Sequence, residues 1–239
     1  MTRVIFLVLA CLLALPGHAQ SRYEKLTTKY RLSHCRERVE TIRDRMRPGM
    51  RAIFTTEPGM PVKITKKLVM NAYADGHAII FSPTICEAIP DDDEFSIIVG
   101  HEIAHNLLGH YAEAVAGQLI GKSLESVLKS VTGYGLYGAG GKIGVIAFSK
   151  DREREADYYG LYLAAYANYD ISDAPDFWRR FSPKAGSWSW THPTHPERSA
   201  RAMLVVVDVE HKKRDLRDLV PDKPPPRENP ATLKSTPRD

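Results

Sequence analysis

Two histidines and a neighbouring glutamate have the types and spacing of a metal site. In the stretch GHEIAHNLLGH, His101 and His105 are one helical turn apart, about 40° around the helix axis, so both can bind one small cation. Zinc suits two imidazoles because it is borderline-soft and has no demanding geometry. Glu102 would lie at the rim of that face, where a carboxylate can take a proton from an activated water. A solvated helix that carries the same letters by chance is the alternative.

A catalytic zinc site needs a third protein ligand besides an open position. The metzincin pattern requires glycine at position 108 and histidine at 111, but the chain has Leu108 and Tyr111, which excludes that geometry. His110 follows His105 by five residues, about 140° around the axis, and cannot join the same metal unless the helix breaks. We therefore expect His110 to be a structural or surface residue.

The acidic segment SKDREREADYYG offers better ligands. Glu153 and Asp157 are four residues apart on a predicted helix, so both carboxylates face the same partner. One of them could bind the metal while the other holds the second ring nitrogen of a ligand histidine. Glu155 is about 200° further around the helix and is expected to face solvent. An exposed helix with charge pairs between residues four apart is the alternative.

The elements that must position these residues predict an α+β fold that is mainly α. Residues 20–50 indicate a surface helix that ends at Pro48. A small antiparallel sheet should follow, beside a histidine helix that runs from about Asp91 to Ala116. The strands are expected at residues 52–54, 62–64, 68–73 and 77–81.

Capping residues predict where several helices begin and end. Ser82 before Pro83 starts one helix, and Asp91 starts the histidine helix. Ser149 is the expected N-cap of the acidic helix, and Asn168 its left-handed C-cap. The glycine-rich residues 132–148 should form a mobile loop or a pair of glycine-rich helices near the site, able to gate access.

The N-terminal residues predict a cleaved secretory signal that ends at Ala19. A short positive start precedes an unbroken apolar run from Val4 to Leu15, which is shorter than the roughly 20 apolar residues of a membrane span. A lipoprotein anchored through Cys11 is disfavoured, because apolar residues would directly follow the lipidated cysteine. We therefore expect the mature chain in the periplasm.

Loss of the signal would leave two cysteines, Cys35 and Cys86. In an oxidising compartment they could form a disulfide that closes a long loop. Two buried free thiols are the alternative. The net charge of +4 comes without a block of basic residues, so no nucleic-acid partner is expected.

The two motifs together resemble the M48 family of zinc metallopeptidases, especially its secreted bacterial members. The resemblance rests on HEIAHNLLGH and SKDREREADYYG and covers roughly residues 60–205. Further elements similar to the family are VMNAY at 69–73, YANYD at 166–170, and THP at 191–193 with Arg198. Departures from the family pattern stand at Lys150, Asn168 and Ser199.

The resemblance implies a zincin-like, or gluzincin, metalloprotease domain that binds one Zn²⁺ per chain. His101, His105 and Glu153 would be the zinc ligands, and Glu102 would be the general base. Asp157 would either accept a hydrogen bond from a zinc ligand and so orient it, or donate a proton. The domain would span residues 51–212, after the signal at 1–19 and the N-terminal helix at 20–50, with a charged, proline-rich disordered tail at 213–239.

The resemblance also implies a substrate site. His192 would contact the substrate or the transition state above the open side of the metal, or cap the metal in a resting state. A loop histidine packed among tryptophans is the alternative. A polypeptide substrate would add as a strand to the edge of the small sheet, near Asn71 and Ala72 or along residues 77–81.

These implications predict a zinc-dependent endopeptidase of the bacterial cell envelope that cuts misfolded or unassembled envelope proteins. Peripheral association with the outer membrane or its assembly machinery belongs to the same expectation, and the oligomeric state is open. The rival hypothesis is a zinc-bearing periplasmic chaperone or assembly factor whose protease activity is latent, with His192 and the glycine-rich segment covering the metal.

Overall fold

The computed structural model describes residues 17–66, 69–117, 119, 126, 139–181, 197–212 and 219–221. Side chains are described from residue 24 onward and, in the helix that begins at residue 139, from residue 150. These residues form a mainly helical fold with a small three-stranded sheet, which confirms the predicted fold class. The predicted signal up to residue 16 and the tail beyond residue 221 lie outside the described residues.

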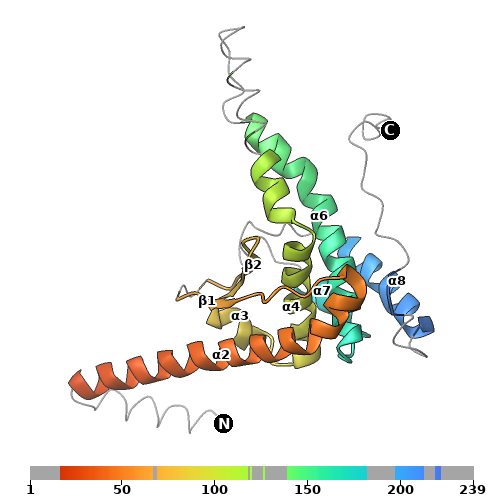
Figure 1. Cartoon of the computed structure of the whole chain (residues 1–239). Coiled ribbons are helices and arrows are strands. Elements are labelled where there is room, and N and C mark those ends of the chain that lie inside the picture. The colour runs from red at the N-terminus through yellow and green to blue at the C-terminus, as the bar shows by residue number, and fades with distance from the viewer. Residues whose placement is uncertain are drawn as a thin grey trace.

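Two tightly packed helices form the centre of the fold, α4 (Asp92–Leu107) and α6 (Ala139–Tyr166) (Figure 1). Their backbones touch where Gly100 meets Gly160. A Cβ atom on Gly100 would lie 2.4 Å from the carbonyl oxygen of Gly160, closer than any real side-chain carbon comes to a backbone atom. Only glycine therefore permits this approach, which brings the histidines of α4 opposite the acidic residues of α6.

The long helix α2 (Gly17–Phe54) crosses below this pair in Figure 1. The prediction that it stops at Pro48 is wrong, and so is the strand predicted at 52–54. A proline inside a helix removes one hydrogen bond, but the apolar face of α2 is held in the core, where Gly49 packs against Tyr166. Its fully buried side chains include Val39, Ile42, Met46 and Met50.

Three short strands form the sheet in the order β1-β3-β2. They are β1 (Val62–Ile64), β2 (Ala72–Ala74) and β3 (Ile79–Phe81). β2 and β3 pair antiparallel, as predicted, but β1 and β3 pair parallel, so the prediction of a purely antiparallel sheet is wrong. The reason is topological: the chain leaves β1 for the far edge and returns through the β2–β3 hairpin, which places β3 in the middle.

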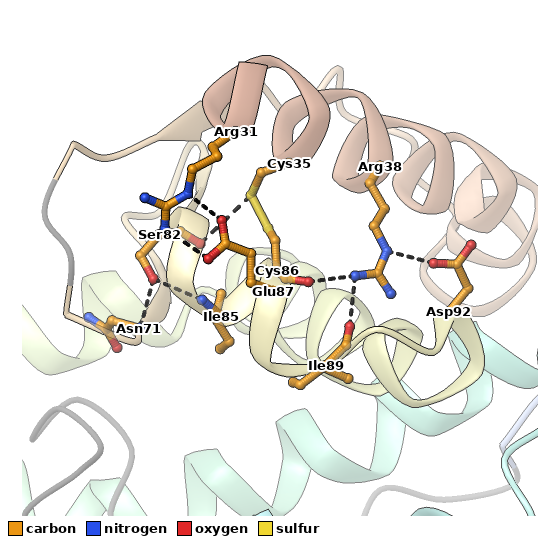
Figure 2. The surroundings of a disulfide bond; sticks show 10 residues. All are labelled: Arg31, Cys35, Arg38, Asn71, Ser82, Ile85, Cys86, Glu87, Ile89 and Asp92. Carbon is orange, nitrogen blue, oxygen red and sulfur yellow. Dashed lines mark hydrogen bonds and ion pairs between the residues drawn. A yellow bond between two sulfur atoms is a disulfide. The ribbon is translucent and has the colours of Figure 1, made fainter. Parts of the chain in front are cut away.

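Helix α3 (Pro83–Ala88) is fastened to α2. Ser82 caps it by accepting a hydrogen bond from the Ile85 amide, and Pro83 begins it, as the sequence predicted. Figure 2 shows the disulfide between Cys35 of α2 and Cys86 of α3, whose Cα atoms are 5.7 Å apart.

Arg38 of α2 binds several groups where α3 leads into α4 (Figure 2). Its guanidinium lies 2.6 Å from a carboxylate oxygen of Asp92. It also donates to the carbonyl oxygens of Cys86, Ile89 and Asp91. The start of α4 is therefore tied to the same helix as the disulfide.

The histidine helix ends earlier than predicted. Asp91 caps α4 as expected, accepting from the Asp93 and Glu94 amides. However, α4 ends at Leu107, and a separate helical segment covers residues 110–117. The break lies at Gly109, whose φ of +70° favours glycine. The prediction of one helix to residue 116 is therefore wrong.

Helix α6 is longer than predicted. It begins at Ala139, inside the glycine-rich segment, so the prediction of Ser149 as its N-cap is wrong. Asn168 has the expected left-handed conformation, with a φ of +62°. Residues 132–138 of the glycine-rich segment lie outside the described residues.

Two further helices, α7 (Ala174–Phe181) and α8 (Glu197–Lys212), pack on each other, and α8 also packs on α6 (Figure 1). The apolar side of α8 buries Ala202, Val205, Val206 and Val209. Near its start, α8 carries Arg198, which it brings to the centre of the molecule. Within the described part of the chain, no helix has both the length and the apolar character needed to cross a bilayer.

Candidate metal centre

The structure brings together three of the predicted residues, His101 and His105 from α4 and Glu153 from α6. The Nε2 atoms of the two histidines are 3.0 Å apart. Each lies 3.3 Å from a carboxylate oxygen of Glu153. Ligands of a tetrahedral zinc ion with bonds of about 2.05 Å are about 3.3 Å from one another. The two distances run to different oxygens, Oε2 for His101 and Oε1 for His105, and one donor atom from each residue lies within 4.8 Å of the other two. The cluster is therefore tight enough for the three residues to share one zinc ion.

Hydrogen bonds behind each ring determine which nitrogen faces this cluster. Nδ1 of His101 lies 2.9 Å from a carboxylate oxygen of Asp157. Nδ1 of His105 lies 2.9 Å from Nδ1 of His110. In neutral rings, protons on these Nδ1 atoms leave lone pairs on both Nε2 atoms, directed at each other and at the carboxylate. Converging lone pairs repel unless a proton or a metal cation lies between them, so the residues fit a metal ion that takes the place of a proton.

The surroundings of His101 favour positive charge. Burial lowers the pKa of His101, but the charge of Glu153 and the hydrogen bonds that His101 donates to Asp157 and Glu153 outweigh burial and raise the pKa to about 9. A divalent cation that displaces this proton is stabilised by the same carboxylates.

Asp157 supports His101 from behind and is itself held by Arg198 of α8. The guanidinium donates from Nε and Nη2 to the two carboxylate oxygens, at 2.7 and 2.5 Å. Burial raises the pKa of Asp157, but the charge of Arg198 and the hydrogen bond from His101 lower it below its ordinary value. An ionised carboxylate has no proton to donate, so the geometry favours the ligand-holding role of Asp157 over the proton-donating one.

Arg198 and Trp178 were not among the predicted site residues. Arg198 is only 7% exposed, and its guanidinium carbon lies 3.5 Å from the centre of the Trp178 ring. Burial lowers the pKa of Arg198, but the charges of Asp157, Glu153 and Glu102 raise it above its ordinary value. The sequence pointed to Arg198 only through its place after THP in the element that resembles the family, and nothing in the sequence pointed to Trp178.

His110 and Glu155 do not lie where the sequence placed them. His110 is 2% exposed and in contact with His105, so the surface alternative is wrong. Glu155 is 6% exposed and lies 3.0 Å from Nε2 of His110, so its prediction as a solvent-facing residue is wrong. The position expected for His110 assumed that the histidine helix continues past Gly109. The break at Gly109 instead turns His110 back toward α6, where it contacts Glu155.

The remaining predicted residues are placed in part. Glu102 is fully buried beside His101. Asn71 precedes β2 and Ala72 opens it, and β2 packs against α4. His192 lies outside the described residues. The catalytic and substrate-binding roles of these residues stay predictions.

Comparison with known proteins identifies the family. The model of peptidase family M48 matches residues 36–203. The chain belongs to peptidase family M48. This match confirms the resemblance seen in the two motifs. It also begins within α2, so part of the helix predicted as a separate N-terminal element lies inside the family match.

Similar proteins are named as metalloendopeptidases. Mitochondrial metalloendopeptidase OMA1 of Arabidopsis thaliana is 28% identical over 145 residues, which cover 58% of this chain and 30% of that protein. OMA1 of Danio rerio is 29% identical over 160 residues, covering 57% and 33%. OMA1 of Schizosaccharomyces pombe is 30% identical over 124 residues, covering 45% and 34%. The chain thus spans about a third of the length of these relatives. No solved structure matches it.

Proposed function

We propose that this chain is a zinc-dependent endopeptidase. The observation that carries the proposal is the convergence of His101, His105 and Glu153, whose donor atoms lie within 4.8 Å of one another. Glu102 is adjacent in sequence to the first of them. Membership of family M48 supports peptide-bond hydrolysis as the reaction. Three protein ligands would leave one position open, as catalytic zinc sites require.

The residues around the cluster have distinct tasks in this reaction. A zinc ion held by the three ligands would polarise the scissile carbonyl and lower the pKa of a water molecule. Glu102 accepts the proton of the attacking water and returns it to the leaving amine. Asp157 holds the ring of His101 in one tautomer, and Arg198 keeps Asp157 ionised.

A polypeptide substrate would add to one edge of the sheet. The alternative at residues 77–81 does not suit this role, because β3 is the middle strand. The β1 edge is covered by α2. Arg36 donates to the carbonyl oxygen of Val62 at 2.5 Å, and Arg43 donates to that of Met60 at 2.7 Å. Such covered edges do not accept a further strand.

The β2 edge is the better candidate. The amide of Ser82 donates to the carbonyl of Asn71, so this carbonyl points toward the β3 side. Because antiparallel pairs alternate, the backbone groups of Ala72 and Ala74 point away from β3. A strand bound to these groups would lie beside α4 and be recognised through its backbone, whatever its sequence.

A latent resting state is the second candidate. Ala72 and Glu102 are both fully buried, and His105 is 9% exposed. A peptide can therefore reach the β2 edge and the metal only after part of the chain moves. This burial favours the hypothesis of a zinc-bearing chaperone or assembly factor whose protease activity must be released.

The cellular role is also a proposal. We place the enzyme in the bacterial cell envelope, acting on misfolded or unassembled proteins, with peripheral attachment to the outer membrane or its assembly machinery. The signal-like residues 1–19 support export, and the disulfide Cys35–Cys86 suits an oxidising compartment. Recognition through the backbone suits unfolded substrates. Fractionation of cells, with sequencing of the mature N-terminus after Ala19, tests the export.

The function is tested by zinc content and casein cleavage in the wild type, Glu102→Gln and Glu87→Gln. We expect one zinc ion per chain in all three. Cleavage should fall by about 10²–10⁴-fold in Glu102→Gln, since the general base is lost. It should persist in Glu87→Gln, which alters only an exposed ion pair with Arg31.

The other possible outcomes distinguish the active endopeptidase from the latent state and from a chain without a metal centre. A wild type without zinc would overturn the metal centre. Full cleavage by a zinc-loaded Glu102→Gln variant would overturn the assigned base. Zinc-loaded wild type that cleaves no casein would favour the latent state.

A further inference from the structure

Helix α6 supports the two histidine ligands by two different routes. Asp157 contacts Nδ1 of His101 directly, at 2.9 Å. Glu155 contacts Nε2 of His110 at 3.0 Å, and Nδ1 of His110 contacts Nδ1 of His105 at 2.9 Å. Both histidine ligands are therefore joined to a carboxylate of the same helix, one directly and one through a further imidazole.

The direction of the hydrogen bonds in the second route follows from Glu155. An ionised carboxylate only accepts, so the proton between Glu155 and His110 belongs to Nε2 of His110. A neutral His110 then has a bare Nδ1, which accepts the Nδ1 proton of His105. This leaves the lone pair of His105 on Nε2, the atom that faces His101 and Glu153.

The fold holds this route in place. The left-handed turn at Gly109 ends α4 and brings His110 back over His105. Arg152 of α6 donates to the carbonyl oxygen of His110 at 3.3 Å, which fixes the first residue of the segment at 110–117. Both side chains of the route are buried, so solvent does not compete for their hydrogen bonds.

We propose that His110 and Glu155 are positioning residues that orient His105 for metal binding. The proposal rests on the metal centre described above and deepens it. His110 holds the His105 ring in the tautomer that presents Nε2, and Glu155 holds His110 in the matching one. Removal of such partners behind a metal ligand typically lowers metal affinity 10–100-fold.

The test is the zinc dissociation constant, measured by competition with a chromophoric chelator at fixed pH. We expect His110→Ala to weaken zinc binding 10–100-fold and Glu155→Gln to weaken it about tenfold. The double variant should bind zinc no more weakly than His110→Ala, because Glu155 acts through His110. His34→Asn and Glu87→Gln, both on the exposed surface, should retain wild-type affinity.

A second variant separates positioning from packing. In His110→Asn the amide oxygen can replace Nδ1 as the acceptor, while the contact with Glu155 is lost. We expect an affinity between those of His110→Ala and the wild type, and no further effect of Glu155→Gln in this background. The visible spectrum of the Co²⁺-loaded protein should change in His110→Ala and return toward the wild type in His110→Asn.

Several outcomes would overturn the positioning role of His110 and Glu155 and leave the metal centre itself unchallenged. One is a wild-type zinc constant in folded His110→Ala and Glu155→Gln; lower melting temperatures alone would indicate a purely structural pair. Additive losses in the double variant are another. If His110→Ala does not fold, Glu155→Gln, which keeps size and shape, decides alone. Absence of zinc from the wild type would instead overturn the metal centre itself.

Discussion

The two sides of the metal cluster differ in how they are built. On the His101 side, Asp157 of α6 forms an ion pair with Arg198 of α8, which stacks on Trp178 of α7. On the His105 side, a local turn supplies His110, and Glu155 completes the route. Besides α4, the His101 side needs α6, α7 and α8 to meet around buried charges. The His105 side needs only the turn after α4 and one neighbouring helix, α6. The His101 side should therefore be the more sensitive to the packing of the whole molecule.

The contact between α4 and α6 carries both sides, so breaking it should have the largest effect. A Cβ on Gly160 would lie 2.7 Å from the amide nitrogen of His101 and 2.8 Å from the carbonyl carbon of Gly100. We expect Gly160→Val to push the helices apart and abolish zinc binding, together with a large loss of stability. Circular dichroism and zinc content check this. Gly59→Ala is the control, because its Cβ meets nothing within 4 Å.

Removal of Arg198 should break the His101 side alone. Arg198→Met leaves the buried Asp157 without its cation, which costs about 3–5 kcal/mol of unfolding free energy and weakens zinc binding. Arg198→Lys should fall between the two, since lysine keeps the charge but not the two-pronged contact. Urea unfolding and zinc titration give the two quantities.

Two further variants sharpen this prediction. Arg201→Met, which removes an exposed ion pair with Glu197, should change stability by less than about 1 kcal/mol. Adding Asp157→Asn to Arg198→Met should recover part of the lost stability, because no uncompensated carboxylate remains. Equal stability of Arg198→Met and the wild type would contradict the charge network.

The pH dependence of zinc binding should report the His101 side. The raised pKa of His101, about 9, means that the metal-free ring holds a proton below that pH. Zinc must displace this proton, so its apparent affinity should rise with pH, about tenfold per unit from neutral pH, and level off near pH 9. In Asp157→Asn the pKa of His101 should fall, so the plateau should begin at a lower pH. Affinity independent of pH between 7 and 8.5 would contradict this.

The disulfide should have the smallest effect on the metal, because it joins α2 to α3 and touches neither side of the cluster. Cys35 and Cys86 are 51 residues apart, so Cys35→Ala with Cys86→Ala should lower the unfolding free energy by about 2–4 kcal/mol. The zinc constant should be unchanged. A reductant should destabilise the wild type but not the double variant. A weakened zinc constant would show that α2 also shapes the cluster.

Local chemistry determined much of this protein from the sequence alone. His101 and His105 are brought onto one face by the helical repeat, whatever surrounds them. Ser82, Asp91 and Asn168 begin or end helices because each satisfies backbone groups of its own neighbourhood. The glycine at position 109 was a comparable local signal for the break after α4, and the expectation of one long helix overlooked it.

The tertiary structure decided what depends on distant partners. Helix α2 continues through Pro48 because the core holds it, and β1 runs parallel to β3 because the hairpin takes the middle place. Arg198 reaches Asp157 only when α8 packs on α6. Spacing along a chain describes directions around one helix axis. Which side chain of another element lies in that direction is determined by how the elements pack together.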